Sequence, residues 1–129
     1  MAKKRVFISF DIDNDLGSKT MLAGQSSLPD SPFEFKDNSV KAHLDGDWKE
    51  KVRRRMDSVD VVIVLCGTKT QTASGVAAEL KIAKEKGKPY FLLWAYADKQ
   101  CKKPTSASNT DKIYKWEWDI LKKLINGER

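Results

Sequence analysis

The sequence feature that most constrains the fold is an uninterrupted apolar run from Val61 to Cys66, which lies between Asp60 and Gly67. A strand with apolar side chains at every position has both faces covered, whereas a strand with one exposed face alternates between apolar and polar residues. The run leads into a polar loop rich in Thr and Ser and then into a helical stretch that carries Glu79. Units of this kind build ligand sites in open α/β sheets. We therefore expect a parallel sheet between two layers of helices.

The remaining hydrophobic pattern predicts strands that alternate with helices along the chain. Strands are expected at residues 6–10, 33–35, 60–66, 89–94 and 113–114. Helices are expected at residues 16–25, along an apolar stripe between Leu44 and Val59, at residues 72–86 before Gly87, and at residues 116–125. This alternation predicts a flavodoxin-like α/β fold, a three-layer, doubly wound architecture with four to five parallel strands in the order 2-1-3-4-5. No repeat or linker divides the chain, so we expect one domain over residues 1–129.

The charge and the cysteine pattern exclude several kinds of site. The net charge of +6 favours anionic partners, but its basic residues are spread along the chain except at Arg53–Arg55. A solvated helix face explains that triplet more simply than a DNA-binding surface, so no nucleic-acid partner is predicted. Cys66 and Cys101 form no CxxC pair or Cys/His cluster, so no disulfide, zinc or other metal site is predicted. Because His43 is the only histidine, chemistry must rest on carboxylates, hydroxyls or backbone groups.

The start of the chain and its hydropathy predict a cytoplasmic protein without membrane contact. The basic residues near the N-terminus precede only five apolar-rich positions before Asp11, which is too short for a signal peptide. No apolar run approaches the roughly 20 residues of a membrane span.

Three loops are predicted to meet at the carboxyl-terminal edge of the sheet, at residues 10–16, 37–47 and 67–74. Glu79 lies one to two turns into the helix after the third loop. At 100° per residue it falls about 40° from Ala83 and about 60° from Val76, at the margin of the apolar stripe. A carboxylate there is either an ordinary surface residue or a partly buried group with a raised pKa, which suits a general acid or base.

The acidic residues after the first strand have three interpretations. Residues 11–13, Asp-Ile-Asp, are similar to the nucleophile motif of haloacid-dehalogenase-type phosphatases, but that motif requires Thr or Val where this chain has Asp15. An acidic pair also follows strand one in response-regulator receivers, which need an Asp at the end of strand three, where this chain has Cys66 and Gly67. The third interpretation is a polar, solvated turn.

Two further patterns have both a structural and a functional explanation. Residues Gly67–Thr70 lack the Gly-x-x-x-x-Gly-Lys-Ser/Thr pattern of a phosphate cradle, so they form a turn whose hydroxyls cap the next helix or touch a ribose or phosphate. Trp94 with Tyr96, and Trp116 with Trp118, are explained more simply by packing in the core and at its rim than by a platform for stacking bases.

A series of segments between residues 4 and 96 keeps the order and spacing of a known family. Its residues are Val6–Asp11, Trp48 with the basic helix, Asp60–Leu65, Gly67 with Thr70, Val76, Glu79 with Leu80, Ala83, and Gly87–Pro89. Together they resemble the TIR-like domain family, including the TIR proteins of Thoeris antiphage defence. Members of that family have the flavodoxin-like fold, in agreement with the hydrophobic pattern.

The resemblance implies an activity and a site. Active members cleave the nicotinamide–ribose bond of NAD⁺, and some cyclise or transfer the ADP-ribose to make a signalling nucleotide. In such a reaction NAD⁺ is the substrate, so no cofactor is expected. Glu79 matches the catalytic glutamate, which would contact the nicotinamide ribose and stabilise an oxocarbenium-like cation. The expected substrate contacts are Phe10, Asp11, Asp37, Thr70, Thr72 and Ser74.

One departure from the family pattern keeps an alternative open. Many relatives carry Trp four residues before the glutamate, where this chain has Gly75, and Ala77 and Ala78 leave the same face bare. A pocket here is wider, differently lined or inactive. The alternative function is a non-catalytic TIR-like module that self-associates or binds a protein partner or a nucleotide as a signalling scaffold.

Overall fold

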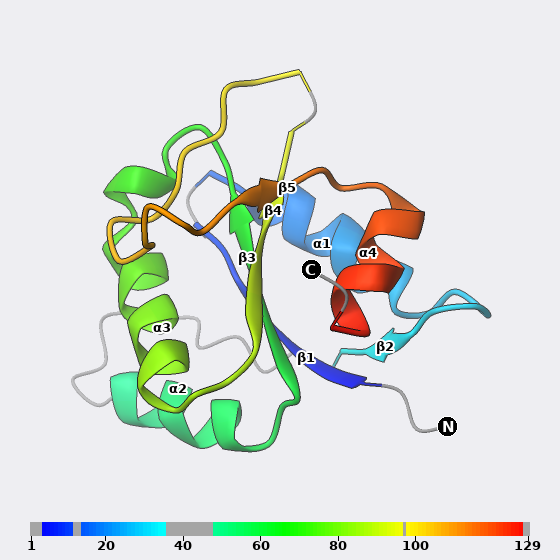
Figure 1. Cartoon of the computed structure of the whole chain (residues 1–129), viewed down its shortest axis with the longest axis horizontal. Helices are drawn as coiled ribbons and strands as arrows, with labels where there is room; N and C mark the ends of the chain where they lie inside the picture. The colour runs from blue at the N-terminus through cyan, green and yellow to red at the C-terminus, as the bar shows by residue number, and fades with distance from the viewer. Residues whose placement is uncertain (1–3, 12–13, 36–47, 97, 128–129) are drawn as a thin grey trace.

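The computed structural model describes residues 4–11, 14–35, 48–96 and 98–127, whose strands form one parallel sheet (Figure 1). The strands are β1 (Lys4–Ser9), β2 (Phe33–Glu34), β3 (Val61–Cys66), β4 (Tyr90–Trp94) and β5 (Ile113–Tyr114). Their spatial order is β2-β1-β3-β4-β5, and every neighbouring pair is parallel. The predicted flavodoxin-like fold class and strand order are therefore confirmed.

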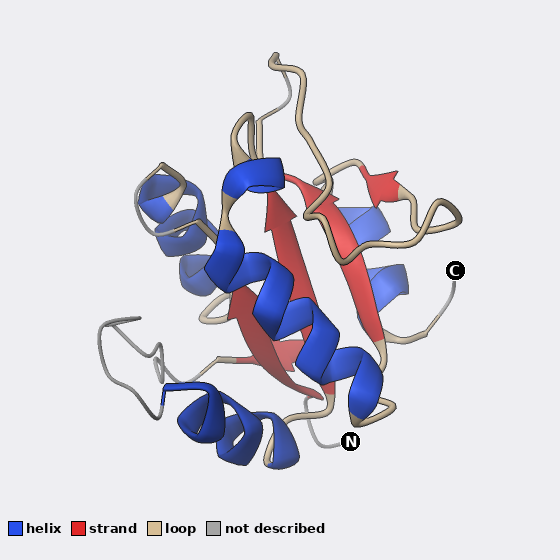
Figure 2. Cartoon of the chain, turned by 90° about the vertical axis from the view of Figure 1, so that its left-hand side faces the viewer, coloured by secondary structure: helices blue, strands red, loops and turns tan. Residues whose placement is uncertain are grey.

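Helices cover both faces of this sheet. In the part of the chain that the structure describes they are α1 (Leu16–Gln25), α2 (Trp48–Asp57), α3 (Ser74–Glu85) and α4 (Trp118–Ile125), with a 3₁₀ helix, η1 (Thr70–Thr72), before α3. Helices α1 and α4 lie on one face, and α2 and α3 lie on the other (Figures 1 and 2). The sheet is thus the middle of the three predicted layers.

Strand β3 is buried at every position, as its apolar run predicts. Its side chains alternate between two cores, because successive residues of a strand point to opposite faces. Ile63 and Leu65 join the core beneath α1 and α4, whereas Val62 and Val64 join the core beneath α2 and α3. The central strand therefore fixes both helical layers.

Helices α3 and α4 both begin two residues later than the sequence predicts, for local backbone reasons. Residues Thr70–Thr72 close into η1, and Ala73 is then extended at φ −83° and ψ 96°, so the α-helix begins only at Ser74. Glu117 is extended at φ −125° and ψ 144°, which delays α4 to Trp118. Strand β2 is one residue shorter than predicted.

Hydrogen bonds and an ion pair join the long polar segment between β4 and β5 to α3. The hydroxyl of Ser106 donates to the carbonyl of Ala77 at 2.7 Å, and the ammonium of Lys84 donates to the carbonyl of Ser106 at 2.8 Å. Lys84 also pairs with Asp111 at 3.4 Å. These bonds hold the segment against the helix that carries Glu79.

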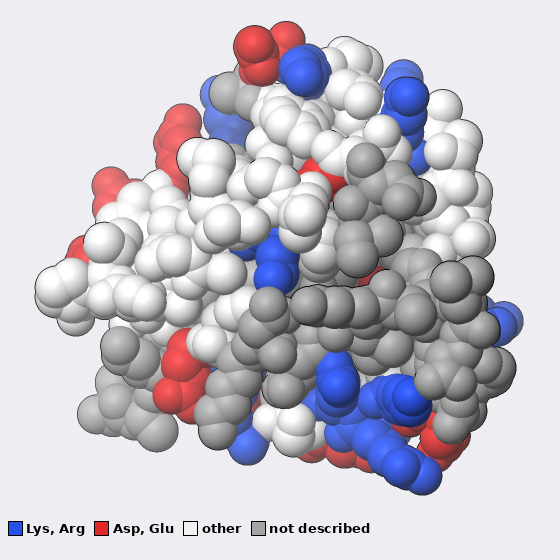
Figure 3. All heavy atoms as spheres, turned by 180° about the vertical axis from the view of Figure 1, so that it is seen from behind, with Lys and Arg blue, Asp and Glu red and all other residues white. Residues whose placement is uncertain are grey.

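Basic side chains gather at the edge of the molecule where α2 lies (Figure 3). Two arginines of α2 have acidic neighbours. The guanidinium of Arg53 lies 3.9 Å from the carboxylate of Glu50 and 4.0 Å from that of Glu85. The guanidinium of Arg54 lies 3.8 Å from the carboxylate of Glu50. These pairs are typical of the solvated helix face that the sequence favoured for the triplet. Within the described ranges, no helix has the length and apolar character needed to cross a membrane.

Candidate active site

Glu79 is placed by α3 against the carboxyl-terminal end of the sheet. Val76, Leu80 and Ala83 bury the apolar stripe of α3, and each is at most 1% exposed. Glu79 lies beside this stripe and is itself only 9% exposed. Of the two interpretations open from the sequence, the structure therefore selects a buried carboxylate over an ordinary surface residue.

The Ser9 hydroxyl is the hydrogen-bond partner that holds this carboxylate. It lies at the end of β1, is fully buried, and donates to Oε1 of Glu79 at 2.8 Å. Strand alternation turns Ser9 toward the α3 face together with Phe7, while Ile8 points to the other core. Ser9 was not among the predicted site residues, although a lone hydroxyl within an apolar strand is a signal that could have identified it.

Burial raises the pKa of Glu79 from 4.5 to about 7, although the hydrogen bond from Ser9 acts in the opposite direction. The cause is the loss of hydration, which penalises the charged form of the carboxyl group. This direction matches the second of the two interpretations that the sequence left open for Glu79. A carboxyl group that titrates near neutrality can exchange its proton and can also become an anion when a cation binds beside it.

The first turns of α3 present small side chains near Glu79. Gly75 is buried and lies four residues before the glutamate, where many relatives carry Trp, and Ala77 and Ala78 are half-buried. Gly75 is covered by its surroundings, and the carbonyl of Ala77 accepts the hydrogen bond from Ser106. Any ligand at this face meets backbone and methyl groups instead of an indole ring.

Asp11 follows β1 and belongs to a tight turn. Its backbone carbonyl accepts hydrogen bonds from the N–H groups of Asn14 at 3.2 Å and Asp15 at 2.7 Å, and its Oδ2 accepts one from the Asn14 side chain at 2.6 Å. Asp11 is 9% exposed, so this turn is less solvated than the third interpretation of the sequence assumed. Among the described residues, no three His, Cys, Asp or Glu side chains are placed to hold a metal ion.

Asp15 is a second buried carboxylate at this edge. It is 1% exposed, and its Oδ1 accepts a hydrogen bond from the hydroxyl of Tyr96 at 2.8 Å. Burial is the main cause that raises its pKa, and the nearby charge of Asp11 adds to the rise. A side chain at position 67 would collide with the Asp15 carboxylate, so only glycine fits there. Sequence reasoning missed this cluster, because Tyr96 is 81 residues away along the chain.

The three substrate contacts expected in the loop at residues 67–74 differ in burial and in hydrogen bonding. Thr70 is fully buried, and its Oγ1 accepts a hydrogen bond from the N–H of Gly67 at 2.7 Å, so this hydroxyl shapes the loop. The Thr72 hydroxyl donates to the carbonyl of Lys69 at 2.8 Å, on an exposed turn. Ser74 is exposed at the start of α3. The contacts of these three residues with a substrate stay predictions.

Among the other expected contacts, Phe10 lies on the far side of the sheet from Glu79. Phe10 is 8% exposed and belongs to the core beneath α1 and α4, on the face opposite to Ser9 and Glu79. The ammonium of Lys19 lies 5.8 Å from its ring centroid. Asp37 lies outside the described residues.

A doubly wound parallel sheet with a buried glutamate behind its third strand has the arrangement of a TIR-like domain. The family model described as "Thoeris protein ThsB, TIR-like domain" matches residues 7–100 of this chain. The chain therefore belongs to this family, as the resemblance predicted. A search of curated proteins found no match.

Proposed function

We propose that this protein cleaves the nicotinamide–ribose bond of NAD⁺, with Glu79 as the catalytic carboxylate, and that the reaction serves antiphage defence. Membership of the Thoeris TIR-like family supports the class of reaction. The observation that carries the assignment of Glu79 is its burial at the carboxyl-terminal edge of the sheet, with the Ser9 hydroxyl bonded to its Oε1. Such a site concentrates the effect of one negative charge, because little water is present to screen it.

The proposed reaction needs an anion more than an acid. When the bond between C1′ and the ring nitrogen breaks, its electron pair goes to the nitrogen, and nicotinamide leaves as a neutral molecule. Positive charge then develops on the ribose, where an ionised carboxylate stabilises it. Water adds to C1′ and loses a proton to give ADP-ribose, whereas attack by a nitrogen of the same molecule gives a cyclic product.

The pKa of Glu79 fits this role. Near neutrality a group with a pKa of about 7 exists in both forms. The positive charge of the bound nicotinamide ring favours the carboxylate form, since an opposite charge nearby lowers a carboxyl pKa. The hydroxyl of Ser9 keeps one oxygen of the group in place during this change.

A second candidate is the non-catalytic TIR-like module, which acts through self-association or through binding of a protein or nucleotide. The observation that favours it is the limited access to Glu79, which is 9% exposed and has one oxygen engaged by Ser9. The bare face at Gly75 also favours it, because the family indole is absent there.

Incubation of the purified protein with NAD⁺, alone and with lysate of phage-infected bacteria, distinguishes the two candidates. We expect release of nicotinamide together with ADP-ribose or a cyclic ADP-ribose-type product, both separated by chromatography. Persistent self-association or partner binding without any consumption of NAD⁺ in either condition would instead establish the non-catalytic module.

A further inference from the structure

A groove of about 1240 Å³ is lined by residues of α1 and α4, by the residues that follow β4, and by residues 112–117. Four aromatic side chains line it: Trp94, Tyr96, Tyr114 and Trp116. All four are half-buried, so part of each ring surface remains accessible. Ser9, Asp11 and Glu79 do not line it. These rings pack against the two cores with part of their surface and leave the rest open to the groove.

Two of these aromatic residues have unused hydrogen-bond donors. Six Trp and Tyr side chains are described, and four of them donate to a protein oxygen, namely Tyr90, Tyr96, Trp116 and Trp118. The indole N–H of Trp94 and the hydroxyl of Tyr114 donate to no protein group within the described ranges. Both of these side chains line the groove. Trp and Tyr side chains combine an apolar ring with one polar atom, so both donors are suited to an acceptor on a flat ligand.

The charges around the groove cancel. Lys112 and Lys115 line it together with Asp98 and Glu117, so two positive and two negative groups face the same space. The ammonium of Lys112 lies 5.4 Å from the centroid of the Tyr114 ring. A polyphosphate would meet as many carboxylates as ammonium groups here. The lining therefore favours an uncharged ligand over an anion.

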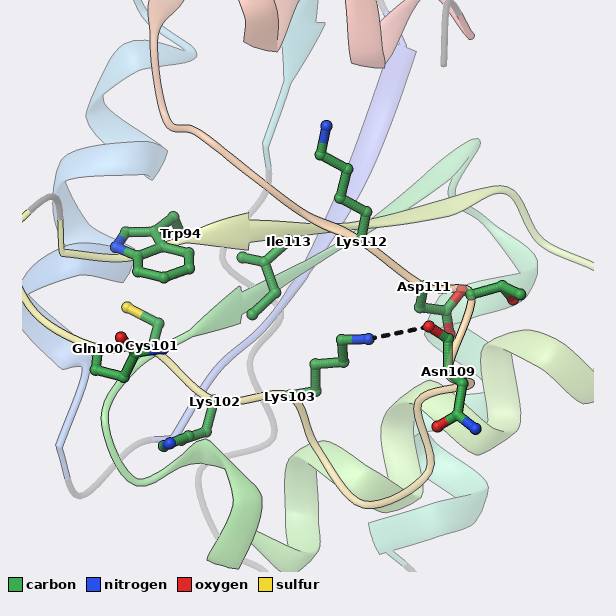
Figure 4. A pocket seen from close by; sticks show the side chains of 10 residues that line it. Trp94, Gln100, Cys101, Lys102, Lys103, Asn109, Asp111, Lys112 and Ile113 are labelled. Carbon is green, nitrogen blue, oxygen red and sulfur yellow. Dashed lines mark hydrogen bonds between the residues drawn. The ribbon is translucent and has the colours of Figure 1, made fainter.

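A neighbouring hollow has a different character. It has a volume of about 560 Å³ and is formed by residues 100–103 and 109–113, with Trp94 at one end (Figure 4). The ammonium of Lys103 reaches the carbonyl of Asn109 at 3.4 Å, and the Trp94 ring nitrogen points away from Ile113. The Trp94 ring is thus shared by the two hollows, since it lines both of them.

We propose that the aromatic groove is a second binding site, which takes an uncharged nucleobase or nucleoside. Flat heteroaromatic rings stack on Trp and Tyr, and ring nitrogens or carbonyls of a base accept from the two unused donors. The site is separate from Glu79 and does not depend on NAD⁺ cleavage. Trp94, Tyr114 and Trp116 hold the ligand, and Met21 forms part of the wall on α1.

Titration of the whole protein with adenosine, guanosine, cytidine and uridine tests this site, with binding followed by isothermal calorimetry and by quenching of tryptophan fluorescence. We expect at least one nucleoside to bind, and its 5′-monophosphate to bind no more tightly. Tyr114→Phe and Trp94→Phe each remove one donor and weaken binding by about two- to tenfold. Glu79→Gln binds the nucleoside as the wild type does, which separates this site from the proposed active site.

Two exposed apolar residues give a matched pair of charge variants. Met21 is 67% exposed and lines the groove, whereas Leu28 is 42% exposed and does not, so both tolerate glutamate without loss of the fold. We expect Met21→Glu to weaken nucleoside binding at least tenfold and Leu28→Glu to leave it unchanged. Absence of binding to all four nucleosides at millimolar concentration would overturn the proposal. Equal binding by both variants, loss of binding in Glu79→Gln, or much tighter binding of the monophosphate would overturn it as well.

Discussion

At the scale of single residues, two opposing effects set the charge of Glu79. Burial removes water from its carboxyl group and raises the pKa, while the Ser9 hydroxyl stabilises the anion and lowers it. Burial is the larger effect, and the pKa is about 7. The folded protein thus holds a proton on Glu79 between about pH 4.5 and pH 7, where the unfolded chain has released it.

This difference predicts how the stability of the protein depends on pH. Because the folded state binds the extra proton, the contribution of Glu79 to the free energy of unfolding falls as the pH rises from 4.5 to about 7 and is constant above that range. The gap between the two pKa values corresponds to about 3 kcal/mol. We expect Glu79→Gln to match the wild type near pH 4 and to be more stable by up to this amount at pH 8, as measured by urea unfolding.

The exposed Glu85 on the same helix supplies the control. Its replacement by glutamine removes an exposed carboxylate and measures how α3 responds to the loss of a negative charge as such. A stability difference between the wild type and Glu79→Gln that does not change with pH would show that Glu79 titrates as an ordinary surface residue.

Replacement of Ser9 tests how far its hydrogen bond lowers the pKa of Glu79. Ser9→Ala removes the hydrogen bond that favours the anion, so the pKa of Glu79 should rise above its wild-type value. NMR titration of the side-chain carboxyl carbon measures this directly and needs no enzymatic activity. A wild-type value near 4.5, or no upward movement in Ser9→Ala, would contradict the environment described for Glu79.

At the scale of elements, the turn after β1 and the loop after β3 are fitted to each other. The Asp15 carboxylate, held by the Tyr96 hydroxyl, fills the space beside Gly67, and Thr70 accepts the N–H of Gly67. Gly67 therefore connects the start of α1 with the loop that leads to α3. Gly87, at φ 65°, follows the end of α3 as the sequence predicted.

Substitution of Gly67 tests this fit. We expect Gly67→Ala to lower the free energy of unfolding by about 1–3 kcal/mol, because the new methyl group collides with the Asp15 carboxylate. In an Asp15→Ala background the same change should cost less, since the collision is gone; thermal or urea unfolding of the four variants measures the coupling. Gly24→Ala in α1, where a methyl group meets open space, should be neutral or stabilising. Equal costs of Gly67→Ala in both backgrounds would disprove the collision.

At the scale of the whole molecule, the sequence predicts the architecture well, because the apolar period of each element decides which faces are covered. The run Val61–Cys66 alone requires a central parallel strand, and the structure buries all of it. The spacing of apolar residues along α3 also singles out Glu79, because it places this carboxylate at the margin of the buried stripe. It does not find Ser9 or Tyr96, because their contacts join positions 70 and 81 residues apart and depend on the final packing. The expectation that Phe10 contacts the substrate has a different, local origin, because it leaves out the alternation of side chains along β1 that turns this ring to the other core.

The rate of nicotinamide release from NAD⁺ by the wild type, Glu79→Gln and Glu85→Gln tests the central claim most directly. All three are assayed at pH 8 under the condition that activates the wild type, with folding verified by urea unfolding. We predict that Glu85→Gln releases nicotinamide at the wild-type rate and that Glu79→Gln is at least about a hundredfold slower, which is typical of the loss of one group that stabilises a developing charge. Equal rates for the wild type and Glu79→Gln would contradict the assignment of Glu79 as the catalytic carboxylate.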